Sequence, residues 1–428
     1  MPRTTSGSEP LQALLLCVAL CTALPVASQE SGTYLPRLRT LRVLPNGAWD
    51  SEPVIRLGGS NYIVISFDDL QHNYVRYTYT LTHCNADWTP SSLLPSEYMD
   101  GFNDQPIEDY TSSTTTATLY NHYTLTLPND QIRELLVSGN YRVDIYESGD
   151  PEPVATACFA VSEQRVGVQF DISGNTDIDT YRTHQQVNFS IDYSAYSLVR
   201  HAEAELRPVV VQNRRWDNCI KDLKPTYLRS HTLVYQHNRR LIFDAANEYR
   251  RMEILDDHTP TMHIESMQYD DPYYHAYVMA DEPRTNYLYD QDQNGRYVVR
   301  NPEDDDSDSE SEYYITHFTL QTPPLPAGDV YLSGDLTNNR LDPTYRMEYN
   351  PIDHQYEIAL PLKQGSYNYQ YLYVPEGSTQ GYTAQTEGNF HQTENEYAVY
   401  VYHRAFGERY DRLIAYVTAS STPSSKSR

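Results

Sequence analysis

The sequence predicts an all-β protein made of tandem immunoglobulin-like and early-set β-sandwich domains. Short runs of alternating apolar and polar residues recur along the chain, and turn pairs such as Asn-Gly, Gly-Gly and Pro-Asn separate them. The segment Tyr141-Arg-Val-Asp-Ile-Tyr146 is typical, because its odd-numbered residues can enter a core while the polar residues between them face water. The 40 tyrosines among 428 residues agree with this class, since tyrosine favours strands.

Residues 1–28 are predicted to be a secretory signal peptide. The apolar run at 11–27 is short and broken by proline, and small residues precede an expected cleavage site before Gln29. A lipid anchor is the alternative. Cys17 and Cys21 each follow leucine, whereas a lipidated cysteine usually follows glycine or alanine, so we expect a cleaved, exported chain.

Three units of strands follow the signal segment. We expect an immunoglobulin-like sandwich at 29–163, a second sandwich at 164–302, an acidic linker or loop at 303–312, an early-set-like sandwich at 313–418 and a disordered tail at 419–428. Strands are expected at 38–44, 62–67, 74–83, 120–127, 141–146 and 155–161, then at 166–172, 186–191, 203–212, 232–235 and 274–279, and finally at 314–320, 330–332, 356–362, 367–374 and 397–402.

The net charge of −26 makes nucleic acid and anionic lipid surfaces poor partners. Only four of the cationic residues are lysines, and the rest are arginines. Tyrosine and arginine are enriched in protein contacts, so a contact role for them stands beside the simpler interpretation that the tyrosines form strands.

Three cysteines remain after the signal segment, namely Cys84, Cys158 and Cys219. An odd number cannot all pair, so the chain has no disulfide framework. A Cys84–Cys158 bond stays open, and a buried free thiol at Cys84 is the preferred interpretation.

The strand ending near residue 83 runs into His83-Cys-Asn-Ala-Asp-Trp88, a corner that ordinary strand chemistry does not require. With Phe67-Asp-Asp-Leu70 and Ser96-Glu-Tyr-Met-Asp-Gly-Phe102, this string resembles the plug-protein family of the type IX secretion system. Further matching strings are Ile107-Glu-Asp-Tyr110, Tyr120-Asn-His-Tyr123, Pro128-Asn129 and Ser138-Gly-Asn-Tyr141. The resemblance implies a non-enzymatic periplasmic subunit at the inner face of the outer membrane, whose partner is the translocon barrel that it closes.

The corner also invites a chemical interpretation, with His83, Cys84 and Asp87 as metal ligands. A strand end supplies only part of one coordination shell, and no second His/Cys pair at ligand spacing stands out. We therefore expect His83 to be hydrogen-bonded in the core, Asn85 or Asp87 to tie the turn, and Trp88 to cap the sandwich edge. A cysteine nucleophile is disfavoured because His83 points to the opposite face of the strand from Cys84.

Two acidic motifs also favour structural roles over chemical ones. Asp290-Gln-Asp-Gln-Asn-Gly295 resembles the start of a calcium-binding EF-hand loop, but its twelfth position is Asn301, so a hairpin within 287–299 is expected. Asp68 and Asp69 cannot face each other across a substrate bond, because consecutive strand residues point apart, and a turn role is expected. We predict no catalytic, cofactor-binding or metal residues and no cofactor.

The third unit is similar to early-set modules, some of which bind starch or glycogen through a tryptophan after the first strand. The corresponding segment, 333–341, has none, and Trp49, Trp88 and Trp216 all lie outside this unit. A glycan-binding protein remains an alternative function, and so does an exported hydrolase with two carboxylates across a cleft between units. For the plug role, exposed tyrosine and arginine side chains in the 89–118 loop are expected to supply part of the contact.

Overall fold

The computed structural model describes residues 29–256 and 259–421. Nearly every element in them is a strand, and the helices are single turns. The all-β class predicted from the sequence is confirmed. The predicted signal peptide at 1–28 lies outside the described residues, as do residues 422–428 of the predicted tail. Residues 419–420 of that tail are ordered, because the last strand continues to Ser420.

The first unit is a sandwich of two antiparallel sheets with one parallel edge strand. One sheet has the order β1-β12-β11-β5-β7, with β3 added to β12, and the other has the order β2-β4-β9-β8. A small β10-β6 sheet and α1 close one end. The bounds are β1 (Gly32–Thr33), β2 (Leu38–Pro45), β3 (Val54–Arg56), β4 (Ile63–Asp69), β5 (Tyr77–Cys84), α1 (Pro95–Tyr98), β6 (Met99–Gly101), β7 (Gln105–Pro106), β8 (Asp109–Ser112), β9 (Asn121–Leu127), β10 (Ile132–Leu135), β11 (Gly139–Glu147) and β12 (Pro153–Ser162).

The second unit also has two sheets. One has the order β13-β14-β18-β17 with β19 added to β14, and the other has the order β16-β15-β29-β30. The bounds are β13 (Gly167–Ser173), β14 (His184–Asp192), α2 (Ala202–Glu205), β15 (Leu206–Gln212), β16 (Arg215–Ile220), β17 (Tyr227–Arg229), β18 (Thr232–Tyr235), η1 (Arg239–Leu241), β19 (Ile242–Asp244), β29 (Glu396–His403) and β30 (Arg412–Ser420).

The third unit contains the β20-β28-β23 sheet, with β25 also on β28, and the sheet of order β21-β22-β24-β27-β26. The bounds are β20 (Arg250–Ile254), β21 (Ile264–Asp270), β22 (Tyr273–Val278), β23 (Tyr297–Val299), α3 (Ser307–Glu310), β24 (Tyr313–Gln321), β25 (Gly328–Ser333), η2 (Asp335–Thr337), η3 (Pro343–Tyr345), β26 (Glu348–Asn350), β27 (Gln355–Lys363) and β28 (Gly365–Pro375).

Strand pairing thus connects segments that the predicted limits at 302 and 313 keep apart. β29, near the end of the chain, pairs with β15 of the second unit, and the last strand, β30, pairs with β29. β20 and β23 pair with β28 in the third unit. The chain therefore crosses twice between these two units, and the second unit is completed only by the last strands.

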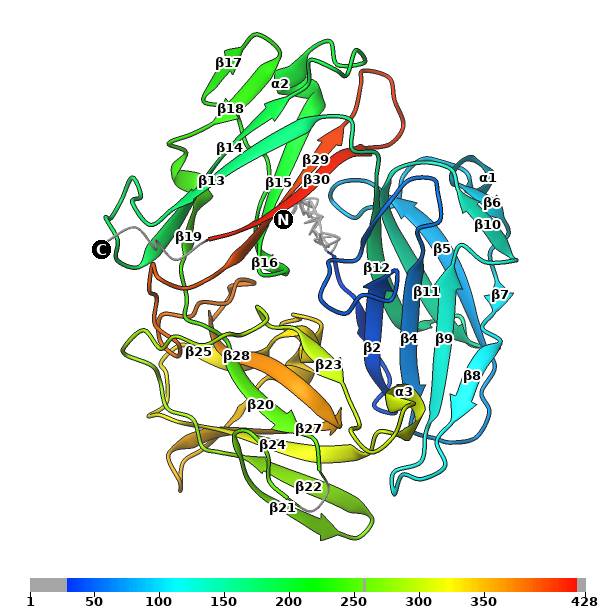
Figure 1. Ribbon diagram of the computed structural model, residues 1–428, viewed down its shortest axis with the longest axis vertical. Coiled ribbons are helices and arrows are strands. Elements are labelled where there is room, and N and C mark those ends of the chain that lie inside the picture. The colour runs from blue at the N-terminus through cyan, green and yellow to red at the C-terminus, as the bar shows by residue number, and fades with distance from the viewer. Residues whose placement is uncertain (1–28, 257–258, 422–428) are drawn as a thin grey trace, which may run out of the picture.

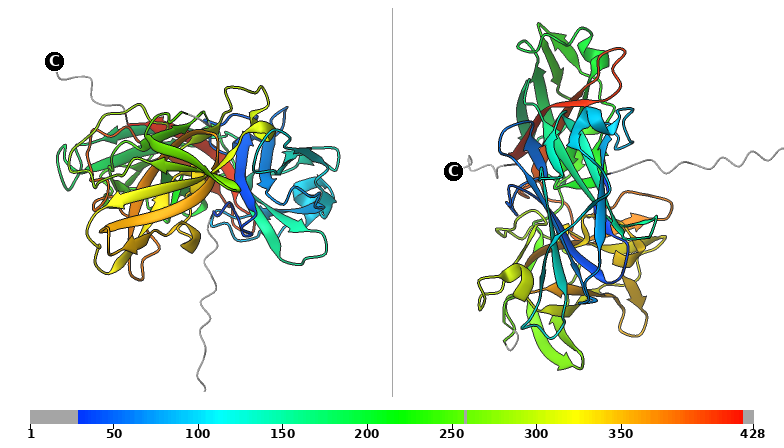
Figure 2. Two further views of the ribbon diagram at one scale, coloured as in Figure 1. Left: turned by 90° about the horizontal axis from the view of Figure 1, so that it is seen from below. Right: turned by 90° about the vertical axis from the view of Figure 1, so that its right-hand side faces the viewer.

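The three units surround a common centre, in a body that is flattened along the direction of view in Figure 1 (Figure 1, Figure 2). The first unit lies on the right in Figure 1, the second at the top and the third at the bottom. Each unit has its own core of buried side chains, and a smaller cluster joins the first and second units. No helix of the described residues is long and apolar enough to span a bilayer.

Tyrosine fills these cores. The largest fully buried side chains of the described residues are all tyrosines, including Tyr77 and Tyr123. In the first unit Phe67 stacks on Tyr123 with ring centroids 5.3 Å apart, and Tyr77 meets Phe67 edge-on at 5.2 Å. Such contacts add to the free energy of burial. Most of the tyrosine excess therefore serves the folding of strands, as the simpler interpretation held.

The acidic run at 303–312, expected as a linker or loop, contains the single-turn helix α3 and contacts the first unit. Asp308 lies 2.6 Å from Arg42 of the first unit. Glu310 accepts hydrogen bonds from Thr114 and Thr115, and Glu312 accepts from the backbone N–H groups of residues 117 and 118. These donors offset the repulsion between like charges, so half of the run forms an ordered contact between the first and third units.

The prediction of two paired strands within 287–299 is wrong. Residues 283–296 contain no strand, and β23 pairs with β28 instead. The turn at Asn294 and Gly295 is present, with φ of 52° and 87°. Asp292 accepts hydrogen bonds from the backbone N–H groups of Tyr249 and Asn294 and so fixes this loop on the third unit.

Candidate functional site: the junctions of the three units

The His83–Trp88 corner is built as a structural turn. His83 Nδ1 lies 2.9 Å from Ser91 Oγ, and Nε2 lies 3.1 Å from the carbonyl oxygen of Ser138. Burial lowers the pKa of His83 to about 4, so the ring is neutral at pH 7. Asp87 accepts from the backbone N–H and the hydroxyl of Thr89 at 3.0 and 2.6 Å. The predicted hydrogen-bonded corner is confirmed.

Trp88, at the end of the corner, contacts the second unit. Its ring meets that of Trp216 edge-on, with centroids 5.7 Å apart, so it packs on a neighbouring domain instead of capping a free edge. Cys84 and Cys158 lie in the same buried cluster, and both are free thiols. Burial raises the pKa of the Cys84 thiol to about 12, which makes it a poor nucleophile. The preferred interpretation of Cys84 is confirmed.

Neutral and charge-assisted hydrogen bonds complete the junction between the first and second units. Tyr402 donates to Asn140 Oδ1 at 2.8 Å, and both side chains are buried. The backbone N–H of Ala86, inside the corner, donates to Asp411 Oδ2 at 3.0 Å. The corner that marks the sequence is therefore also where the first unit docks on the second.

The junction between the first and third units is ionic. Lys363 Nζ lies 2.6 Å from Asp68 Oδ2, and both side chains are fully buried. His122 Nδ1 lies 2.6 Å from Asp68 Oδ1, and Tyr313 donates to Oδ2 at 2.5 Å. The Lys363 ammonium also sits 4.1 Å from the centre of the Tyr120 ring, a cation–π contact. Burial alone raises the pKa of Asp68, but Lys363 and His122 outweigh it and hold the pKa at about 2.

Asp68 and Asp69 point to different neighbours, as their strand positions predict. The turn role expected for them holds for Asp69, which accepts from the backbone N–H of Gln71 at 3.0 Å and also from the Tyr77 hydroxyl at 2.6 Å. For Asp68 the turn role is wrong, because its carboxylate faces the third unit and pairs with Lys363.

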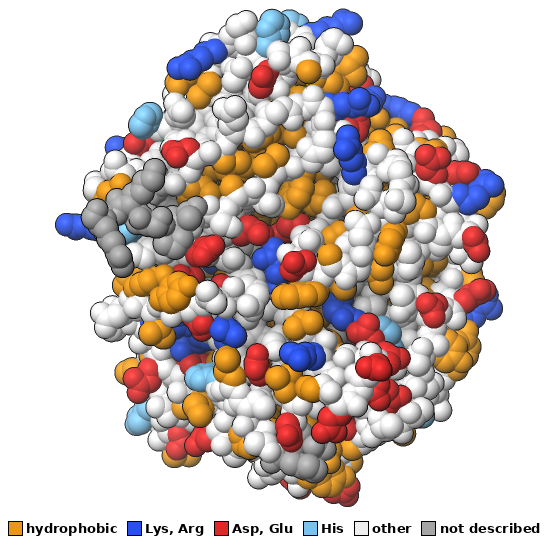
Figure 3. Space-filling view, viewed as in Figure 1, with side chains coloured by type: hydrophobic (Ala, Val, Ile, Leu, Met, Phe, Trp, Pro, Cys, Tyr) orange, Lys and Arg blue, Asp and Glu red, His pale blue; other side chains and the backbone are white. Residues whose placement is uncertain are grey.

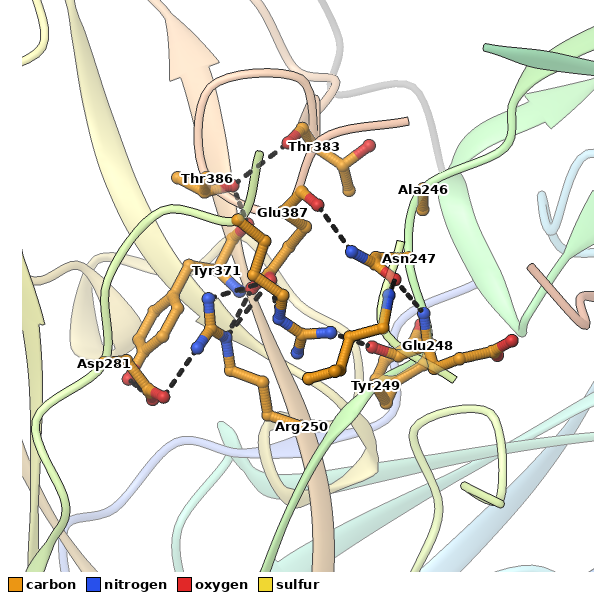
Figure 4. A network of polar contacts seen from close by, with 12 residues as sticks. Ala246, Asn247, Glu248, Tyr249, Arg250, Asp281, Tyr371, Thr383, Thr386 and Glu387 are labelled. Carbon is orange, nitrogen blue, oxygen red and sulfur yellow. Dashed lines mark hydrogen bonds and ion pairs between the residues drawn. The ribbon is translucent and has the colours of Figure 1, made fainter. Parts of the chain in front are cut away.

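A third polar network joins the two chain segments that pass between the second and third units (Figure 4). Arg250 donates to both oxygens of Glu387 at 3.1 Å and to Asp281 at 2.6 Å. Asn247 donates to the backbone carbonyl of Glu387 at 3.1 Å, and the backbone N–H of Tyr371 donates to Oε1 of the same residue at 2.9 Å. The two chain segments that pass between the units are thereby held to one another.

Sequence reasoning missed the ionic cluster around Asp68 and the network around Glu387, because the members of each lie far apart in the chain. The one available signal was Lys363, which ends a strand in a chain with only four lysines. No group of three or more His, Cys, Asp or Glu side chains suited to a metal ion occurs in the part of the chain that the structure describes.

Comparison with known proteins decides the family. Residues 38–163 match the family described as "Type 9 secretion system plug protein 1st domain". The chain belongs to the type 9 secretion system plug protein family. The match covers the first unit, including the corner at His83–Trp88.

A solved relative of this plug-family chain extends the comparison to the other units. The crystal structure of a hypothetical protein from Parabacteroides merdae ATCC 43184 is 46% identical, with a TM-score of 0.90, over 92% of this chain and 100% of that one. A C-terminal domain of the Streptococcus agalactiae AgI/II polypeptide BspA is 6% identical, over 89% of this chain and 100% of that one, with a TM-score of 0.16, too low to bear on the fold. No curated protein matches. The family gives the protein a plug role related to type 9 secretion.

The 89–118 segment of the plug domain exposes other residue types than those expected. It contains no arginine, and Tyr98, the last residue of α1, is buried, so the expectation of tyrosine and arginine contacts there is wrong apart from Tyr110. The large apolar side chains that it exposes most are Leu94, at 64%, and Phe102, at 79%. The segment is ordered by α1 and by the pairing of β6 with β10, so it presents these apolar side chains on a fixed support.

Proposed function

We propose that the protein is a non-enzymatic periplasmic plug subunit that binds and seals the periplasmic opening of the type IX secretion outer-membrane translocon. The observation that carries this proposal is the match of residues 38–163 to the plug family. The predicted signal peptide supports export, and the net charge of −26 favours a soluble protein that stays off anionic lipid. The partner is the translocon barrel, and no cofactor is required.

The junctions support an obstructing role because they resist relative movement of the units. A body that closes a pore must keep its shape against the flow of solutes and the pull of the channel. Here each pair of neighbouring units shares buried contacts, represented by Trp88–Trp216, Lys363–Asp68 and the clamp around Glu387. Removing one member of such a buried set costs several kcal/mol, so separation of the units is unfavourable.

Leu94 and Phe102 are the side chains that we assign to the contact with the barrel. Large apolar side chains that stay exposed on a folded surface favour protein contacts. Both lie in the plug-family domain, and both are more than half exposed. Losing the burial of two such side chains weakens an interface by about 3 kcal/mol or more, which is over a hundredfold in affinity.

Affinity purification from cell envelopes tests the proposal. The wild-type protein should bring down an outer-membrane barrel of the secretion system, and the double variant Leu94→Ser, Phe102→Ser should lose most of it. Ile352→Ser is the matched control, because Ile352 is 85% exposed but lies on the third unit, outside the plug domain. Failure of the wild-type protein to bring down any barrel would overturn the proposal. Equal recovery with the double variant would overturn the assignment of the contact face.

A further inference from the structure

A cavity lies where the three units meet. It is lined by Glu52 and Trp88 of the first unit, Arg214 and Trp216 of the second, and Asp335 and Asn339 beside η2 of the third. Its volume is about 100 Å³, several times the roughly 10–15 Å³ that one water requires. In the space-filling view, acidic, basic and hydrophobic side chains meet at the centre of the molecule (Figure 3). Of the junctions described above, the Trp88–Trp216 contact forms part of its wall.

All the tryptophans of the chain line this cavity. The sequence contains three, and Trp49, Trp88 and Trp216 are each part of the wall. Trp88 and Trp216 are packed edge-on against each other, whereas Trp49 is 39% exposed and leaves part of its ring open. A core needs no tryptophan, as the tyrosine-filled units show. Three of these large flat rings around one hollow point to a ligand with an apolar face.

The wall also holds polar atoms without protein partners. Trp88 is 5% exposed, and its Nε1–H donates to no atom of residues 29–256 or 259–421. Asn339 Nδ2 donates to Asp335 Oδ1 at 2.9 Å, and a carboxylate can only accept, so this bond fixes the orientation of the amide. Asn339 Oδ1 is then an acceptor with no donor in the described part of the chain. A buried donor and a buried acceptor without partners are costly unless a ligand or water satisfies them.

The charges of the wall favour a neutral ligand. Arg214 Nη2 lies 2.7 Å from Asp335 Oδ2, and Arg214 Nε lies 3.6 Å from Glu52 Oε1. The Asp335 carboxylate would repel an anion, and the charge of Arg214 opposes a cation. Burial raises the pKa of Glu52 to about 7, so this side chain carries only part of a charge at neutral pH. A hydroxyl group both donates and accepts, so it can satisfy Trp88 Nε1 and Asn339 Oδ1 without any charge.

We propose that this central cavity binds one ring of a neutral saccharide, with its C–H face on a tryptophan and its hydroxyls on Trp88 and Asn339. This function is additional to the plug role and does not depend on it. The ring is bound and not cleaved, because the guanidinium of Arg214 lies within 4 Å of the carboxyl groups of both Glu52 and Asp335. Glycosidases instead leave space for the substrate bond between their two carboxyl groups.

The test titrates the purified, exported form of the full chain with glucose, galactose, mannose and N-acetylglucosamine, up to tens of millimolar. Tryptophan fluorescence is the readout, since every tryptophan lines the cavity, and calorimetry gives an independent affinity. We expect a saturable response to at least one neutral sugar and a weaker one to glucuronate and glucosamine. Asn339→Ala should weaken binding about tenfold, the usual effect of one lost hydrogen bond. Trp49→Ala, at the exposed rim, should weaken it similarly without unfolding the chain.

Asn350→Ala, at the end of β26 in the third unit and outside the cavity wall, is the matched control and should bind as the wild type does. Four results would overturn the proposal. The first two are no saturable response to any neutral sugar and tighter binding of a charged sugar. The third is that Asn339→Ala and Trp49→Ala both keep the wild-type melting temperature and both bind with unchanged affinity. The fourth is hydrolysis of aryl glycosides. The plug proposal is tested independently of the saccharide proposal, because its readout is recovery of the barrel.

Discussion

The first unit meets its two neighbours through junctions of opposite chemistry. Toward the third unit the contact is a buried ionic cluster around Lys363 and Asp68. Toward the second unit it is mainly aromatic and thiol packing around Trp88 and Trp216, with hydrogen bonds at its edge. The first unit thus fixes its two domain contacts by mechanisms that differ in their dependence on pH and on single substitutions.

The difference follows from what each junction loses when it is disturbed. A buried ion pair needs both partners, since a lone buried charge is strongly unfavourable. Aromatic packing loses contacts in proportion to the atoms removed and does not change with protonation. The ionic junction should therefore open in acid, whereas the aromatic junction should persist.

The largest effect is expected from Lys363→Ala. The substitution leaves the Asp68 carboxylate buried with only His122 and Tyr313 as partners, so the free energy of unfolding should fall by about 3–5 kcal/mol. Urea unfolding followed by circular dichroism measures it. The double variant Lys363→Met, Asp68→Asn removes both charges and should recover most of the loss. A single-variant cost below about 1 kcal/mol would remove the distinction between the junctions.

Trp88→Ala should come next, with a loss of about 3 kcal/mol from the junction with the second unit. The loss should be the same at pH 7 and at pH 3, because no titrating group supplies the contact. Trp49→Ala is the control, since its ring is 39% exposed and should cost less. A strong pH dependence of the Trp88→Ala effect would mean that the two junctions are energetically linked.

Acid should weaken the ionic junction selectively. The pKa of Asp68 is about 2 in the folded protein, below its ordinary value of 3.8. The carboxylate therefore contributes stability above about pH 4 that is lost as the pH falls toward 2, and a shift of nearly two units is worth roughly 2.5 kcal/mol. Unfolding free energies at several pH values should show a shallower decline for Asp68→Asn than for the wild type. Parallel curves would contradict the assignment.

The smallest effect is expected from an exposed ion pair inside the first unit. Arg133 lies 2.7 Å from Asp100, with side chains 69% and 45% exposed. Solvent screens such a pair, so Arg133→Ala should change the unfolding free energy by less than about 1 kcal/mol. The comparison with Lys363→Ala then isolates burial as the reason why one ion pair matters and the other does not.

The sequence predicted the local structure of the first unit well because alternation is a local signal. Tyr77, Tyr79, Leu81 and His83 are buried in β5 as the pattern indicates. The hydrogen bonds of the His83–Trp88 corner are local as well, so residue chemistry was sufficient to anticipate them. The fold class and the family followed from these features.

Partners distant in sequence could not be predicted in the same way. Alternation over residues 397–402 predicts a strand and its inward face but not its neighbour, which is β15 in the second unit. The charges of the acidic run predict a linker or loop, whereas Arg42 and the donors at 114–118 hold it against the first unit. The central cavity draws its wall from all three units, so its tryptophans could not be grouped from sequence spacing.

The most direct measurement of plug function is the conductance of the secretion barrel reconstituted in a planar bilayer. Purified protein is added on the side of the periplasmic opening, first as wild type and then as Leu94→Ser, Phe102→Ser. If the chain obstructs the pore, the current falls toward the level of the bare membrane with the wild type and stays high with the variant. An open-channel current that is unchanged by saturating wild-type protein would contradict the plug role proposed here.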